Sequence, residues 1–271
     1  MAAISANQFN YVRELLYHAS GIALDHDKGY LVESRLQSLA RREGMPLEDL
    51  LNRLKGPESD RYRSKVVEAM TTNETSFFRD VHPFSALRNP ILSTLATRRG
   101  GNVTIWCGAC SSGQEPYSIA MAVHEHLPSL VSRIRVIATD ISTEMLEITD
   151  AGVFSQMEVN RGLPAPLLLR FFDRNGFKWR IKPELRRMLT LRQLNLVAPS
   201  WPGLPVADVI FLRNVLIYFD TDTKKAVLER VRRHMAPDGY LFLGNAETTL
   251  NLDPSFKRCT LDRATCYRLQ D

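Results

Sequence analysis

Five short apolar runs, each separated from the next by a longer stretch, follow one another after Gly100. They cover residues 103–107, 134–139, 189–194, 208–212 and 240–243. Strands that are apolar along their length and alternate with helices are typical of a parallel sheet with helices on both faces. The sequence therefore predicts an α/β fold of the Rossmann-like type for the larger part of the chain.

The first part of the chain has a different pattern. Up to about residue 84, apolar side chains recur at helical spacing in four segments, with no run of strand type. Ser5, followed three residues later by Gln8, resembles a capping box at the start of the first helix. We therefore predict an all-α N-terminal domain at 1–84 and an α/β domain at 85–271.

Two segments of the second domain do not fit the alternation of strands and helices. A segment at about 173–190, read from "DRNGFKWRIKPELRRML", predicts a small antiparallel β insertion. The stretch "SFKRCTLDRATCYRL" at 255–269 predicts a terminal hairpin. The predicted architecture is therefore a parallel sheet with a small β-subdomain and an antiparallel C-terminal edge.

Composition narrows the class of protein. The 271 residues are 44% hydrophobic, with a net charge of +5 that suits RNA, an acidic protein face or a membrane edge equally well. The chain shows no export signal at its start and no apolar run near the roughly 20 residues that span a bilayer. With four cysteines and no such signal, we expect reduced thiols, a cytoplasmic protein and, by default, a monomer.

The first predicted strand runs into the turn "GACSSGQEP", which has the character of a cofactor loop. Gly108 and Gly113 permit a tight turn close to a ligand, but the spacing lacks the full G-x-G-x-x-G pattern of a dinucleotide site. Asp140 ends the second strand, where a carboxylate can accept both hydroxyls of a ribose. Glu115 would repel a pyrophosphate but suits the cationic end of S-adenosylmethionine.

The pair Cys107-x-x-Cys110 in the same turn permits another interpretation, a metal or redox site. Cys259 and Cys266 are six residues apart, so they do not supply a second pair with the spacing of a zinc site. We therefore expect no metal and interpret the cysteines as small residues of the loop.

Several motifs together resemble one family. They are "TTNETSFFRD" at 71–80, "CGACSSGQEPYSIAMA" at 107–122, "ATDIS" at 138–142, "VIFLRNVLIYFD" at 209–220 and "PDGYLFLGNAE" at 237–247. This combination is similar to the CheR-type chemoreceptor glutamate methyltransferases, enzymes that use S-adenosylmethionine and release S-adenosylhomocysteine. The resemblance implies a methyltransferase sheet and transfer of a methyl group to receptor glutamates, forming glutamyl 5-methyl esters in chemotactic adaptation.

The resemblance also implies roles for individual residues. Those expected to contact the cofactor, together with Gly108 of the turn, are Asn73, Thr75, Arg79, Glu115, Asp140, Asn195, Leu196, Arg213 and Asn214. Tyr218 corresponds to a family tyrosine near the methyl-transfer point. An arginine just before the first strand is also implied, as Arg98 or Arg99, and we assign Arg98 a catalytic role beside Tyr218.

The expected partner is the acidic methylation helix of a chemoreceptor. A basic segment at the N-terminal side supplies Lys28, Arg35, Arg41 and Arg42 for this contact. The predicted insertion is short and lacks the Gly-x-Gly-Pro turn of relatives that bind a receptor pentapeptide, so we expect pentapeptide-independent binding.

Two other functions are compatible with part of the sequence. A nucleic-acid methyltransferase would suit the basic charge, but the chain has "RNVLIYF" where an Asn/Asp-Pro-Pro-aromatic motif is expected, so we expect no nucleic-acid partner. A non-catalytic module that binds S-adenosylmethionine would keep the same cofactor residues, and the presence of Tyr218 and of an arginine near Arg98 argues against it.

Overall fold

The computed structural model describes residues 4–100 and 102–270. The chain forms two compact units. One contains the chain up to Thr72 together with Tyr218–Lys224, and the other contains Asn73–Ile217 and the chain from Lys225 onward. No helix of the described residues is long and apolar enough to cross a membrane.

The first unit is built from helices, as predicted. They are α1 (Ala6–Ser20), the 3-10 turn η1 (His26–Lys28), α2 (Gly29–Arg42), α3 (Leu47–Arg53) and α4 (Ser59–Met70). The expected capping box starts α1, because the Ser5 N–H donates to the Gln8 side chain at 2.9 Å and the Gln8 N–H donates to Ser5 Oγ at 3.3 Å. The apolar faces of the helices meet around fully buried side chains such as Val12, Leu36 and Leu50.

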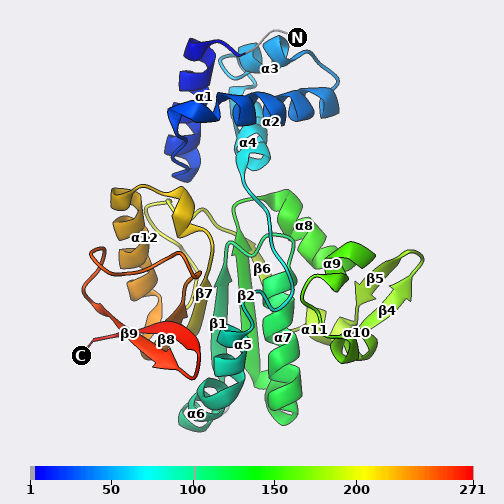
Figure 1. Ribbon diagram of the computed structural model, residues 1–271, viewed down its shortest axis with the longest axis vertical. Coiled ribbons are helices and arrows are strands. Elements are labelled where there is room, and N and C mark those ends of the chain that lie inside the picture. The colour runs from blue at the N-terminus through cyan, green and yellow to red at the C-terminus, as the bar shows by residue number, and fades with distance from the viewer. Residues whose placement is uncertain (1–3, 101, 271) are drawn as a thin grey trace. The chain divides into compact units, whose positions relative to one another are not determined.

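The second unit is built on a sheet of seven strands (Figure 1). In chain order these strands are β1 (Val103–Gly108), β2 (Ile134–Asp140), β6 (Leu189–Gln193), β7 (Ala207–Leu212), β8 (Met235–Phe242), β9 (Phe256–Leu261) and β10 (Ala264–Leu269). The helices and helical turns that follow α4 are α5 (His82–Ala86), η2 (Leu87–Ile91), α6 (Leu92–Arg98), α7 (Gln114–His126), η3 (Pro128–Arg133), α8 (Thr143–Ala151), α9 (Gln156–Asn160), α10 (Ala165–Phe171), α11 (Pro183–Arg186), η4 (Leu216–Tyr218) and α12 (Thr221–Arg233). The α/β prediction is confirmed.

The strand order is β6-β2-β1-β7-β8-β10-β9. The five strands expected from the apolar runs are parallel to one another, and the C-terminal hairpin adds β10 antiparallel to β8. β8 starts earlier than the apolar run at 240–243 suggested. A register shift between Ala207 and Val209 of β7 accommodates this extra length.

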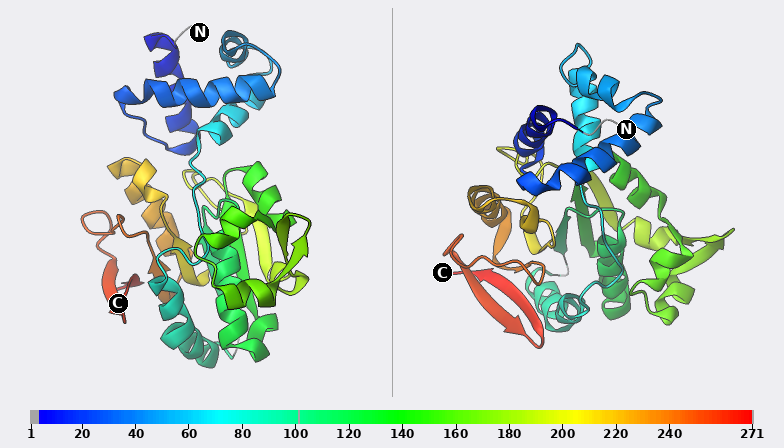
Figure 2. Two further views of the ribbon diagram at one scale, coloured as in Figure 1. Left: turned by 45° about the vertical axis from the view of Figure 1, so that its right-hand side comes forward. Right: turned by 45° about the horizontal axis from the view of Figure 1, so that its top comes forward.

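The direction in which strands are added reverses at β1. From β1 the chain adds β2 and then β6 on one side, and it later adds β7, β8 and the hairpin on the other side. Because parallel crossovers are right-handed, α7 and α12 lie on opposite faces of the sheet; Figures 1 and 2 show α7 against β1 and β2. In an open parallel sheet, ligands bind at the carboxyl ends of the strands beside such a reversal, here the ends of β1 and β7.

The predicted antiparallel insertion is present but draws on more of the chain than 173–190. Its sheet has the order β3-β5-β4, with β4 (Phe172–Asn175) and β5 (Lys178–Ile181) as a hairpin. The third strand, β3 (Val153–Ser155), lies earlier in the sequence and pairs with β5. A strand of three residues is too short to show a period of two, so the apolar pattern did not predict it.

An arginine joins three elements at the amino edge of the main sheet. Arg99, just after α6, donates from Nε to Asp208 of β7 at 2.8 Å and from Nη2 to Asp238 of β8. Asp208 also accepts the N–H of Thr104 in β1 at 2.8 Å. The hydrogen bond from Arg99 holds the pKa of the Asp238 carboxyl below its usual value.

We predict that Arg99→Ala lowers the free energy of unfolding at pH 7 by about 1–2 kcal/mol, since charge-assisted hydrogen bonds are lost from side chains about one-third exposed. A carboxyl whose pKa is lowered by folding stabilises the fold above its unfolded value of about 3.9 and loses that effect as the pH falls below it. The difference from wild type, measured by urea unfolding, should therefore shrink between pH 5 and pH 3. Arg98→Ala, which removes a more exposed partner of Asp238, is the control and should cost under about 0.5 kcal/mol. A difference for Arg99→Ala that is independent of pH would contradict this role.

Candidate functional site

The turn between β1 and α7 has a backbone that few residues other than glycine allow. Ala109, Ser111 and Gly113 all have positive φ, at 54°, 50° and 97°. A Cβ on Gly113 would lie 2.8 Å from Cγ2 of Thr149, so a side chain is excluded there both by conformation and by space. The turn therefore delivers Glu115 into the first turn of α7 at the carboxyl edge of the sheet.

Gly108, expected beside the cofactor, has a packing reason to be glycine. A Cβ at this position would lie 2.9 Å from Cδ1 of Leu212 in β7 and 3.2 Å from the ring of Trp106. The close approach of β1 and β7 accounts for this glycine.

Asp140, at the end of β2, is held by the turn itself. Its Oδ2 accepts the N–H of Ser111 at 2.8 Å, and its Oδ1 accepts the N–H of Ser142 at 2.9 Å. These bonds fix the orientation of a carboxylate that is only 6% exposed. Ser111 also donates from Oγ to the carbonyl of Asn73 at 2.7 Å, so one residue of the turn ties two expected site residues together.

Asn195 and Leu196 come to the same edge because β6 pairs with β2. The N–H of Leu194 donates to the Asp140 carbonyl at 2.9 Å, which places the residues after β6 beside the end of β2. The side chain of Asn195 accepts the N–H of Val197 at 3.1 Å, and Leu196 is buried.

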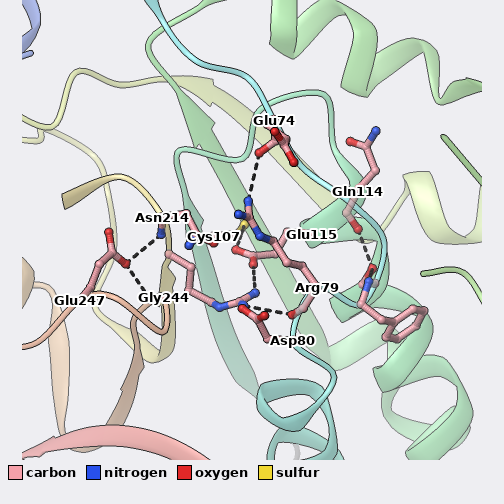
Figure 3. Close-up of polar contacts among 12 residues, drawn as sticks. Glu74, Arg79, Asp80, Cys107, Gln114, Glu115, Asn214, Gly244 and Glu247 are labelled. Atoms are coloured by element: carbon pink, nitrogen blue, oxygen red, sulfur yellow. Dashed lines mark hydrogen bonds and ion pairs between the residues drawn. The ribbon is translucent and has the colours of Figure 1, made fainter. Parts of the chain in front are cut away.

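Arg213, at the end of β7, is the most buried charge of the site. Its side chain is 1% exposed, and it donates from Nη1 to Glu115 and from Nη2 to Asp80, each at 2.5 Å (Figure 3). Nη2 also donates to the carbonyl of Arg79 at 3.0 Å. Arg213 therefore joins the segment before α5 to the helix after β1, at the point where the strand order reverses.

The segment from Asn73 to Arg79 runs along the same edge. The Phe78 N–H donates to Ser118 Oγ of α7 at 2.9 Å, and buried Phe77 packs edge-on against Phe154. The half-buried side chain of Arg79 donates to the carbonyl of Glu74 at 3.2 Å (Figure 3). Thr75 lies between these contacts and is also half-buried.

Glu247 is a site residue that the sequence did not single out. Its carboxylate accepts the N–H groups of Asn214 at 2.8 Å and Gly244 at 2.6 Å (Figure 3). It also accepts the N–H of Ile217 at 3.3 Å. Asn214 has a positive φ of 59°, so the turn after β7 depends on this support. The signal was available in the sequence as an acidic residue in the loop after the last parallel strand.

The structure does not bring Arg98 to this edge, which corrects the prediction that it lies at the site. Arg98 ends α6 and donates to Asp238 at 3.2 Å, and Arg99 is bound to Asp208 and Asp238. Both lie before the amino end of β1, and the six residues of that strand span about 20 Å at roughly 3.3 Å per residue. Neither arginine reaches a group bound beside Glu115.

Tyr218 ends η4 and belongs to the helical unit, where its carbonyl accepts the N–H of Ala23 at 2.9 Å. Tyr218 is the next residue after Ile217, whose N–H donates to Glu247. Its place at the methyl-transfer point stays a prediction.

The two cysteines of the turn are both buried, and burial raises the pKa of each thiol well above its ordinary value. Cys107 donates from Sγ to Glu115 at 3.4 Å. Neutral buried thiols are poor nucleophiles, which agrees with their interpretation as small residues of the loop. Among the described residues, no group of acidic, histidine and cysteine side chains could hold a metal ion.

The charges at this edge fit a cationic nucleoside better than a phosphate. Glu115 and Asp80 share the guanidinium of Arg213. With Asp140 and with Arg79 on the same edge, the charged side chains are three carboxylates and two arginines, a net charge of −1. Glu115 also occupies the first turn of α7, where an anionic ligand would otherwise bind. A sulfonium or ammonium group beside Glu115 and ribose hydroxyls beside Asp140 suit these side chains.

Comparison with known proteins agrees with this site. Residues 73–265 match the family described as "CheR methyltransferase, SAM binding domain", and residues 7–71 match its all-alpha domain. The chain belongs to the CheR methyltransferase family. The matched SAM binding domain begins at Asn73, where the second compact unit begins, and it contains all the site residues described above.

Relatives extend over nearly the whole chain. Chemotaxis protein methyltransferase 1 of Pseudomonas aeruginosa is 39% identical, with 99% of each chain covered. The chemotaxis protein methyltransferase of Escherichia coli is 34% identical, covering 98% of this chain and 92% of its own. Among solved structures, magnesium protoporphyrin IX methyltransferase from Synechocystis is 13% identical, with a TM-score of 0.38 over 80% of this chain and 94% of that one.

We predict that Arg213→Met destabilises the protein by about 3–5 kcal/mol, because it leaves the Glu115 and Asp80 carboxylates without their buried partner. Urea unfolding measures the change. The double variant Arg213→Met with Glu115→Gln should recover part of the loss, since one stranded charge is removed.

Arg233→Met is the matched control, because that arginine is exposed and pairs with Glu229 one turn earlier in α12. It should cost under about 0.5 kcal/mol. Similar costs for the two methionine variants would show that the buried cluster contributes nothing beyond a surface ion pair.

Proposed function

We propose that this protein transfers the methyl group of S-adenosylmethionine to glutamate side chains of membrane chemoreceptors, forming glutamyl 5-methyl esters in chemotactic adaptation. The observation that carries the proposal is similarity over nearly full length to relatives named chemotaxis protein methyltransferase. The negative carboxyl edge of the sheet supports the choice of a cationic methyl donor. We further propose that the protein acts as a cytoplasmic monomer.

The proposed cofactor residues are those that the structure collects at the carboxyl edge. Glu115 would hold the cationic end of the cofactor, Asp140 the ribose, and Asn195 with Leu196 the base, with Asn73, Thr75 and Asn214 completing the surroundings. When bound, S-adenosylmethionine supplies an electrophilic methyl group on a positively charged sulfur.

Methyl transfer to a glutamate carboxylate needs no proton transfer by the protein. A glutamate with an ordinary pKa of about 4.3 is already ionised at pH 7, so no general base is needed. Attack of a carboxylate on a cation dissipates charge, which a site that excludes water favours. The residues around the acceptor therefore need to position it in line and keep water out.

Tyr218 and an arginine are proposed to orient the incoming carboxylate. Since Arg98 lies at the opposite edge, we assign this role to Arg79, whose carbonyl is bound by Arg213 and whose half-buried side chain donates to the Glu74 carbonyl on the same edge (Figure 3). A hydroxyl and a guanidinium can hold a carboxylate by hydrogen bonds without taking a proton from it.

The receptor is proposed to contact the helical unit through basic side chains of α2. Of the four expected residues, Arg35 is committed to its own unit, because it donates to the carbonyls of Met70 at 2.6 Å and Thr71 at 2.8 Å at the end of α4. Lys28 pairs with Asp27 at 2.9 Å. Arg41 is exposed at the last turn of α2, so we place the contact at this turn, which also carries the exposed Arg42.

The proposed activity predicts that radiolabelled methyl groups pass from S-adenosylmethionine to chemoreceptor-containing membranes, and that mild alkali then releases the label as volatile methanol. An ester has this lability, whereas an N-methyl group is stable to the same treatment. Stable label would overturn the glutamate assignment, and labelling of added RNA or DNA would support a nucleic-acid methyltransferase. Binding of the cofactor without any transfer would support a non-catalytic module.

A variant of Tyr218 tests the role proposed for its hydroxyl. Tyr218→Phe should lower kcat by about tenfold or more while leaving the Kd for S-adenosylmethionine within about twofold, because its hydroxyl is proposed to act on the acceptor. Equal losses in turnover and cofactor affinity would contradict that role.

Pentapeptide-independent binding remains part of the proposal. The β4–β5 hairpin turns in two residues, Gly176 and Phe177, and Gly176 has a φ of +60°. Such a short hairpin offers little edge to an added strand. We predict that calorimetry at a protein concentration of about 100 μM detects no binding of a receptor C-terminal pentapeptide. A micromolar Kd would contradict the prediction.

A further inference from the structure

A cavity lies at the carboxyl edge of the main sheet, on the side away from β2 and β6. Its volume is about 270 Å³, and it lies between the start of α5, the loop after β8 and the β9–β10 hairpin. Residues of three elements line it, among them His82, Gly244, Glu247, Arg258, Arg263 and Tyr267. The residues proposed for the cofactor follow β1, β2, β6 and β7, and only the loop residues beside Asp80 and Glu247 border both regions.

The acidic side chains in the wall of this cavity are already engaged. Asp80 accepts Nη2 of Arg213 at 2.5 Å, and Glu247 accepts the N–H groups of Gly244 and Asn214 at 2.6 and 2.8 Å. The charge of Asp80 is therefore paired with a guanidinium, and the carboxylate of Glu247 is stabilised by backbone N–H groups.

The basic side chains of the cavity are not balanced in this way. Arg258 donates to Thr265 Oγ1 at 3.2 Å, and within residues 4–100 and 102–270 neither Arg258 nor Arg263 forms an ion pair. Both arginines are exposed, so the guanidiniums remain accessible from solvent. The side of the cavity formed by the hairpin thus presents two positive charges to whatever enters it.

The register of the hairpin places the side chains of Arg258, Thr265 and Tyr267 on one face. Arg258 pairs directly with Tyr267, and Thr265 lies two residues before Tyr267, so all three point to the same side. The neighbouring pair, Lys257 with Arg268, points to the other side and lines a different depression. Tyr267 is 4% exposed and forms the floor beside Arg258.

We propose that this cavity binds carboxylate side chains of the acceptor protein, next to the glutamate that is methylated. The inference rests on the proposed function, because it takes the acceptor to be an acidic protein segment. The cofactor residues occupy one half of the carboxyl edge, and the cavity occupies the other half, beside the end of β7. Arg258 and Arg263 bind acidic groups that flank the methylated position, through charge-assisted hydrogen bonds that select an acidic segment over a neutral one.

The test compares steady-state methyl transfer to receptor-containing membranes by wild type and by the double variant Arg258→Ala with Arg263→Ala. We expect the KM for the acceptor to rise about tenfold or more, as loss of charge-assisted hydrogen bonds predicts, with kcat and the Kd for S-adenosylmethionine within about twofold. Arg258→Lys with Arg263→Lys keeps the charge and should retain most of the affinity. An unchanged KM for the acceptor would overturn the proposal.

Lys257→Ala is the matched control for Arg258→Ala. It removes the same charge from the adjacent position of β9, whose side chain points to the other side of the hairpin. Its KM should stay at the wild-type value, and an equal rise in both single variants would show a general charge effect that contradicts a defined site.

A binding experiment separates this inference from the proposed function. A helical peptide with glutamates four residues apart, and the same peptide with glutamines, are titrated into the full-length protein with fluorescence detection. Binding of the glutamate peptide that is lost in the double alanine variant supports the cavity even if no methyl group is transferred. Equal binding by wild type and variant, or no binding by wild type, overturns it, and a wild type that binds but transfers no label defeats only the proposed function.

Discussion

One buried guanidinium holds together the carboxyl edge of the sheet. Arg213 follows β7, Glu115 follows β1, and Asp80 precedes α5, so three segments far apart in sequence meet at one side chain. A buried cation without partners would be strongly destabilising, and so would either carboxylate alone. The strand reversal at β1 and β7 creates the place for a ligand, and this ion-pair cluster fixes the shape and the negative charge of that place.

The cluster also explains how the surrounding segments are ordered. Arg213 binds the carbonyl of Arg79 as well as the two carboxylates, so the irregular segment after α4 is anchored without secondary structure of its own. Glu247 does the same for the turn after β7 by collecting N–H groups. Buried polar groups joined by several hydrogen bonds specify one arrangement of loops, which a set of apolar contacts would leave less defined.

The fold was predictable because its signals are local. The apolar runs gave the five parallel strands, and Ser5 with Gln8 gave the start of the first helix, since periodicity and capping depend on neighbours in sequence. The site was predictable where residues follow strands, as Glu115 and Asp140 do. Arg98 shows the limit of the resemblance, because a residue just before β1 lies at the amino end of that strand, opposite the carboxyl edge that carries Glu115 and Asp140. The supports Asp80 and Glu247 were missed for a related reason, since their partners are more than thirty residues away or are backbone groups.

The distribution of charge along the carboxyl edge follows from these supports. Around β1 and β2 the carboxylates of Glu115 and Asp140 outnumber the one buried arginine, while at the β9–β10 hairpin Arg258 and Arg263 form no ion pair within the described chain. A cationic donor and an anionic acceptor would each find the opposite charge on its own half. Asp80 and Glu247 also line the acceptor half, but Arg213 and backbone N–H groups bind them, so Arg258 and Arg263 are the charges left to meet an acidic group. The same sheet edge can therefore distinguish the two reactants by sign before any shape-specific contact is made.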